Sequence, residues 1–114
     1  MKLFEPLLAG AAREKVVVAH LDAERRLLGL TEEEGGVGEV PLPIRAILAD
    51  ALRLGSAGLI VGHNHPSGDP TPSKADCEAT RSLATTARQL GIRVHDHLVY
   101  GRGEWRSFRA LRLL

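Results

Sequence analysis

The stretch AGLIVGHNHPSGDPTPSKAD, residues 57–76, places a strand, a stiffened loop and the start of a helix in direct succession. Residues 57–62 form a short, continuous apolar run bounded by glycines, which is typical of a central strand covered on both faces. Prolines restrict the loop that follows, and a second helix is predicted to begin at Ser73. His63 and His65 therefore stand just beyond the end of a strand, in the crevice where α/β folds place their ligand sites.

The rest of the chain predicts the other layers of such a fold. A helix is expected within residues 41–55, opened by proline and closed by Gly55. Residues 31–40 are polar and rich in glycine, and they predict a surface loop. Further strands are expected at residues 15–21, 26–30, 92–101 and 104–108. The pattern indicates an α/β or α+β domain, with a sheet of about four to six strands flanked by two helices.

Composition excludes several classes of protein. A chain of 114 residues with a net charge of +1 is one ordinary globular domain and no strong polyelectrolyte. Cys77 is the single cysteine, so an intramolecular disulfide and a cysteine-based zinc knuckle are both excluded. No apolar run approaches the roughly 20 residues of a membrane span, and the N-terminus is charged too early for a signal peptide. These features predict a cytoplasmic protein with no membrane partner.

Helical spacing makes Asp76 the first residue of a buried stripe that continues through residues 80, 83, 87 and 90. A buried carboxylate needs a donor or a cation, and His63, His65 and a divalent metal would provide one. Two histidines and one carboxylate are a ligand set of catalytic zinc, with a fourth position left open for water. The alternative is a capping box, because Ser73 and Asp76 have the spacing S-x-x-D. A cap explains these two residues and leaves both histidines unexplained.

The order His63-x-His65, then ten residues, then Asp76, with Ser73 three residues before the aspartate, resembles the motif of the JAMM (MPN+) metalloproteases. The longer string HNHPSGDPTPSKAD is similar to the RadC branch of that superfamily. This resemblance implies a cytidine-deaminase-like (JAB/MPN) three-layer α/β/α fold, a central mixed sheet flanked by helices, and zinc as the metal. Residues 1–114 are then one RadC-like JAB domain, and no helix-hairpin-helix region is expected in them.

A metallohydrolase of this type needs a carboxylate that takes a proton from a zinc-activated water, whose pKa falls toward ~7, and delivers it to the leaving amine. Glu14, at the mouth of the first strand, is predicted to be this catalytic general acid/base. Glu39 and the glutamates at 32–34 compete with it, from a loop that offers little rigidity. As in JAMM proteases, the Ser73 hydroxyl is predicted to donate to the developing oxyanion.

The predicted function is a zinc-dependent metallopeptidase that acts on a peptide or protein substrate, including an isopeptide-linked one. The alternative is a binding module that serves DNA repair or recombination through protein contacts. Its local support is an arginine-rich C-terminus, with weak support for DNA binding from Arg102, Arg106, Arg109 and Arg112. Nucleobase deamination needs a cysteine-rich zinc set and is nearly ruled out by the single cysteine.

The other histidines are expected to be structural. His95 and His97 form a second H-x-H on a predicted strand, where alternation places both on one face and Asp96 on the other. No third ligand accompanies them at a convincing spacing. His20 lies within the first predicted strand, and Asn64, between the two site histidines, is expected to serve the turn.

Overall fold

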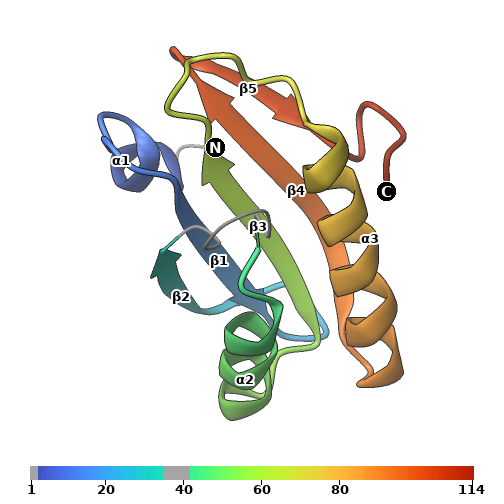
Figure 1. The fold of residues 1–114 in the computed structure, drawn as a ribbon. Helices are drawn as coiled ribbons and strands as arrows, with labels where there is room; N and C mark the ends of the chain where they lie inside the picture. The colour runs from blue at the N-terminus through green and yellow to red at the C-terminus, as the bar shows by residue number, and fades with distance from the viewer. Residues whose placement is uncertain (1–2, 35–41) are drawn as a thin grey trace.

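The protein is described by a computed structural model, which covers residues 3–34 and 42–114. Its elements, in chain order, are α1 (Glu5–Leu8), β1 (Lys15–Leu21), β2 (Leu27–Glu34), α2 (Ile44–Leu54), β3 (Gly58–Asn64), α3 (Lys74–Gln89), β4 (Arg93–Gly101) and β5 (Glu104–Ser107). The strands form one sheet in the order β2-β1-β3-β4-β5 (Figure 1). The sheet is mixed and flanked by helices, so the expected α/β fold with a central mixed sheet is confirmed.

Each face of the sheet has its own hydrophobic core. One face packs against α2 and α3 through apolar side chains that include Val16, Val61 and Leu83. The opposite face is covered by the short helix α1, where Phe4 and Leu8 pack against Val17 and Leu98 of the sheet. The order of layers is therefore helices, sheet, helix, with the third layer reduced to a single turn.

One parallel pair of strands fixes where a site can form. β3 and β4 run parallel, whereas β1 is antiparallel to both β2 and β3. A parallel pair requires a crossover connection, and α3 supplies it. Four segments consequently meet at one end of the sheet: the C-terminal ends of β3 and β4, the first turn of α3 and the start of β1 (Figure 1).

Two helix caps predicted from the sequence are present in the structure, one at the end of α2 and one at the start of α3. Gly55 ends α2 in the left-handed conformation, with φ 69°, which glycine adopts without steric cost. Ser73 is the N-cap of α3, and the reciprocal capping box with Asp76 is present. The expected buried stripe of α3 is wrong at its last position, because Leu90 is the C-cap and its side chain is 46% exposed.

The expected loop at residues 31–40 is wrong over residues 31–34, which belong to β2. Thr31 to Glu34 complete an antiparallel ladder with β1, in which Val17 lies opposite Glu32. β2 is the last strand on its side of the sheet order, so charged side chains can alternate toward solvent while the backbone pairs with β1. Glu39, a competing candidate base, lies outside the described residues.

β3 also extends further than expected. It ends at Asn64, so that His63 lies within the strand and His65 directly follows it. Among the described residues, no helix has the length and apolar character needed to cross a membrane.

Candidate metal centre

Four side chains that could hold a metal ion gather at the end of the sheet where β3 and β4 finish. Glu14, His63, His65 and Asp76 each offer one ligand atom, and these atoms all lie within 4.8 Å of one another. The Nε2 atoms of His63 and His65 are 3.0 Å apart. His63 Nε2 lies 3.5 Å from Asp76 Oδ1 and 3.6 Å from Glu14 Oε1. The structure thus brings together the three predicted ligands and the predicted general base.

Strand register explains why Glu14 reaches residues that are far away in the sequence. Val16 of β1 is the partner of His63 in the antiparallel ladder with β3. Glu14 precedes Val16 by two residues, and His65 follows His63 by two residues. The two residues therefore lie next to each other, where β1 begins and β3 ends. A side chain two residues along a strand points to the same face, which directs Glu14 toward the face occupied by His63.

Asp76 takes part in the capping box and also faces both site histidines, so the two interpretations that the sequence left open are compatible. Its Oδ2 accepts the backbone N–H of Ser73 at 2.8 Å and lies 3.0 Å from His65 Nε2, while Oδ1 faces His63. The residue is 2% exposed. Burial alone would raise the pKa of Asp76, but the neighbouring imidazoles of His63 and His65 and the hydrogen bond from the Ser73 N–H hold that pKa well below its usual range. The group is therefore an anionic carboxylate at neutral pH, which could serve as a metal ligand.

His65 sits on a loop that is fixed to β4. Its backbone N–H donates to the carbonyl of Tyr100 at 2.8 Å, and its ring Nδ1 lies 2.8 Å from the carbonyl oxygen of Asp69. The same loop packs so closely on β4 that a Cβ added to Gly101 would lie 2.6 Å from the Gly68 carbonyl oxygen. A side chain at position 101 would clash with the loop backbone. The loop and the C-terminal end of β4 are thus held in close contact.

The protonation of His65 follows from its two oxygen neighbours. Nδ1 faces the Asp69 carbonyl and Nε2 faces the Asp76 carboxylate, so both ring N–H groups of the cation find acceptors. The hydrogen bond to Asp76 raises the pKa of His65 above its usual value, against the opposing effect of burial. Without a metal, a proton on Nε2 occupies the position that a metal ion would take.

The ring nitrogen of His63 that points away from the cluster contacts a third histidine, His97. This nitrogen, Nδ1, lies 2.6 Å from Nε2 of His97, and Nδ1 of His97 lies 2.6 Å from the hydroxyl of Thr80 on α3. All three side chains are buried. His97 was expected to be a structural histidine, and sequence reasoning did not find this chain of contacts. The available signal was topological: parallel neighbours β3 and β4 place His97 beside the strand segment that ends at His63.

Asn64 is a second residue whose role the sequence did not reveal. Its Oδ1 accepts the backbone N–H of Lys15 at 2.7 Å, and its Nδ2 donates to the carbonyl of Arg13 at 3.0 Å. Glu14 lies between these two residues. Asn64 therefore fixes the backbone on both sides of Glu14, which goes beyond the turn role expected for it.

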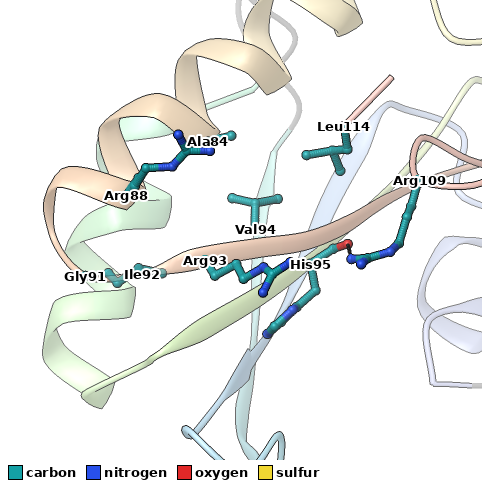
Figure 2. Close-up of a pocket in the computed structure, with 9 residues that line it drawn as sticks. All are labelled: Ala84, Arg88, Gly91, Ile92, Arg93, Val94, His95, Arg109 and Leu114. Atoms are coloured by element: carbon teal, nitrogen blue, oxygen red, sulfur yellow. Dashed lines mark hydrogen bonds between the residues drawn. The ribbon is translucent and has the colours of Figure 1, made fainter. Parts of the chain in front are cut away.

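The expectation that His95 and His97 share one face of their strand is wrong. The register of β4 against β3 shifts between the pairs Leu59–Val94 and Ile60–Asp96, so His95 is an extra residue in the ladder. Such a bulge resets the alternation of side chains. His97 points toward Thr80 of α3, and Val94 packs in the core on the same side. Figure 2 shows that His95 projects from the opposite side of the strand to Val94.

The remaining candidates do not join the cluster. The glutamates at 32–34 lie on β2, and among the described residues the group that could hold a metal contains Glu14 as its single glutamate. The ring of His20 is buried between two hydroxyls, with Nδ1 2.9 Å from Ser56 and Nε2 2.9 Å from Thr31. This environment is that of a core histidine with both nitrogens satisfied.

One of the C-terminal arginines lines a cavity beside β4. A cavity of about 520 Å³ beside β4 is lined by Arg88, Arg93 and Arg109 together with His95 (Figure 2). Arg109 is the one member of the C-terminal arginine series that lines it, and its guanidinium donates to the His95 carbonyl at 3.1 Å. DNA binding by this chain stays a prediction.

Comparisons with known proteins agree with the geometry. A family model described as the RadC-like JAB domain matches residues 1–113. A protein of Rhodobacter capsulatus named UPF0758 protein is 44% identical over 108 residues, which cover 94% of this chain and 50% of that protein. The chain thus spans about half the length of this curated relative. The resemblance to the RadC branch, inferred from the string HNHPSGDPTPSKAD, is confirmed.

Proposed function

Because this chain belongs to the family of RadC-like JAB domains, we propose that it is a zinc-dependent metallohydrolase of the JAMM type that cleaves a peptide or isopeptide bond. The observation that carries this proposal is the convergence of His63, His65, Asp76 and Glu14 at the end of β3. A structural cluster of two histidines and a carboxylate would not need a further glutamate beside it. A hydrolytic centre needs one as its base.

The donor set fits zinc in chemistry and in spacing. Imidazole nitrogen and carboxylate oxygen are ordinary zinc ligands, at bond lengths of about 2.0–2.2 Å. Ligand atoms of a tetrahedral site with such bonds lie about 3.3–3.6 Å apart. Between the Nε2 atoms of His63 and His65 and the oxygens of Asp76, the separations are 3.0–3.5 Å. His63, His65 and Asp76 would hold the ion.

Zinc bound there would supply Lewis acidity and a water nucleophile that is active at neutral pH. Glu14 supplies the proton transfers. Its carboxylate accepts a proton from the attacking water and returns it to the leaving amine nitrogen, as the peptide C–N bond breaks and a carboxylate and a free amine form. The Glu14 side chain is 34% exposed, so it can reach both the ligand cluster and a substrate at the surface.

Ser73 supports this chemistry from the start of α3. Its Oγ accepts the Asp76 backbone N–H at 3.0 Å, and no acceptor for its own hydroxyl proton is found among residues 3–34 and 42–114. A hydroxyl fixed in this way can donate to the carbonyl oxygen of the substrate as negative charge develops on it.

The proposal is tested by zinc titration of the metal-free protein, together with hydrolysis assays on linear and isopeptide-linked peptides. We expect one zinc equivalent per chain and hydrolysis that is lost on chelation and restored by zinc. A chain that takes up no zinc at neutral pH would refute the proposed centre. Stoichiometric zinc without hydrolysis of either peptide class would refute the peptidase assignment and leave the metal site standing.

Zinc affinity is expected to depend on pH in a direction set by His65. Its pKa is raised by Asp76, and its proton must leave Nε2 before a metal can bind. Below that raised pKa, the apparent affinity should fall by up to about tenfold for each pH unit. Calorimetric titration in buffers of different ionisation enthalpy should show proton release that increases as the pH is lowered from 8 to 6. Proton uptake over this range would contradict the assignment.

A further inference from the structure

A buried hydrogen-bonded chain leads away from the cluster to α3. It runs from His63 Nδ1 to His97 Nε2 at 2.6 Å, and from His97 Nδ1 to the Thr80 hydroxyl at 2.6 Å. Both distances are short for hydrogen bonds that involve a nitrogen. The three side chains come from β3, β4 and α3, so the chain joins the three elements that meet behind the site.

The positions of the protons along this chain follow from the site itself. A metal ligand at His63 Nε2 must present a lone pair, so the ring proton of neutral His63 resides on Nδ1. His97 Nε2 must then accept that proton's hydrogen bond, which places the His97 proton on Nδ1, where it is donated to Thr80. Both ring protons then have an acceptor, and each tautomer is defined by the next group along the chain.

The surroundings of His97 favour this arrangement. The residue is 0% exposed, and its ring stacks on Phe108 with centroids 4.5 Å apart and an interplanar angle of 12°. Both ring nitrogens of His97 face hydrogen-bonding partners, His63 Nδ1 and the Thr80 hydroxyl, which suits a neutral imidazole that accepts at one nitrogen and donates at the other. Stacking and the Thr80 contact together fix the ring plane.

We propose that His97 is a positioning residue, which with Thr80 holds His63 in the tautomer and orientation that bind the metal. This inference rests on the metal binding of the proposed function. His65 has an ordinary partner for this task, the backbone carbonyl of Asp69. His63 uses another imidazole, which makes its orientation dependent on two further side chains.

The test compares zinc affinity in His97→Leu, which removes the acceptor, with His97→Gln, whose side-chain oxygen can accept from His63. We expect His97→Leu to weaken zinc binding about 10- to 100-fold, the range typical of lost outer-sphere partners, and His97→Gln to restore most of it. Thr80→Val keeps the shape of the residue and removes the hydroxyl, and it should give a smaller loss. Equal zinc affinity in wild type and His97→Leu, or equal loss in His97→Leu and His97→Gln, would overturn the proposal.

A second readout does not involve the metal. Long-range ¹⁵N–¹H spectra of the metal-free protein should place the His63 proton on Nδ1 in the wild type and show a mixture of tautomers in Thr80→Val. A His63 proton on Nε2 in the wild type would overturn the proposal. If the wild type itself binds no zinc, the proposed function fails, and these spectra still decide the tautomer.

His20→Leu is the matched control. His20 is also fully buried between hydrogen-bonding partners, but it lies opposite Leu59 near the other end of β3. This change should lower the thermal unfolding temperature and leave zinc affinity unaltered. A loss of zinc affinity equal to that of His97→Leu would show that general destabilisation is the cause, and would overturn the proposal.

Discussion

Replacing Asp76 with asparagine is expected to abolish zinc binding in a chain that still folds. The amide oxygen of asparagine can accept the Ser73 backbone N–H, which preserves the cap of α3. The negative charge that a zinc ligand supplies is lost. We expect zinc affinity to fall by more than about 100-fold, beyond the range for loss of an outer-sphere partner. Competition with a chelator at pH 7.5 measures the change.

Asp76→Ala separates the two roles of this residue. It removes both the ligand and the acceptor of the cap, so the metal-free protein should lose about 1 kcal/mol of stability relative to Asp76→Asn. Thermal unfolding of both metal-free variants makes this comparison. If Asp76→Asn keeps zinc affinity close to that of the wild type, Asp76 is a capping residue and the assigned ligand set is wrong.

Glu14→Gln is expected to stop hydrolysis while zinc remains bound. The amide has the size of the carboxylate but cannot accept a proton from water, and general base catalysis typically contributes about 10²–10⁴-fold in rate. Asn64 binds the backbone on either side of residue 14, so the side chain should keep its position. The expected result is a loss of this size in kcat, with a zinc affinity within about threefold of the wild type.

Glu32→Gln is the matched control for Glu14. Glu32 lines the same cavity of about 540 Å³ and forms a 3.5 Å ion pair with Lys15. Exposed pairs of this kind contribute little to stability, so kcat should be unchanged. Should Glu32→Gln lose activity while Glu14→Gln keeps it, the base has been assigned to the wrong residue.

The residues of the cluster could be predicted because their signals are local. His63, His65 and Asp76 are close in sequence, and the helical spacing of α3 turns Asp76 inward. Glu14 needed a further argument, since its approach to His63 depends on the antiparallel register of β1 with β3. The caps at Gly55 and Ser73 were predictable for the same local reason, because each requirement is met within a few residues.

The errors arose where long-range contacts override local pattern. The bulge at His95 reverses the alternation of β4, and no residue type near it marks the shift. The acidic run at residues 32–34 has poor strand propensity, yet it is a strand because β1 offers its backbone hydrogen bonds. Likewise, Asn64 looks like a turn residue in the sequence, while its actual partners lie about fifty positions earlier.

The contact between Asn64 and residues 11–15 has a consequence for how the domain may be trimmed. A fragment that starts at Lys15 would retain every strand of the sheet. It would lack Glu14 and the Arg13 carbonyl that Asn64 binds, as well as Phe4 and Leu8, which cover one face of the sheet. The leading segment is therefore as much a part of the candidate metal centre as the loop that carries His65, although it contributes no strand.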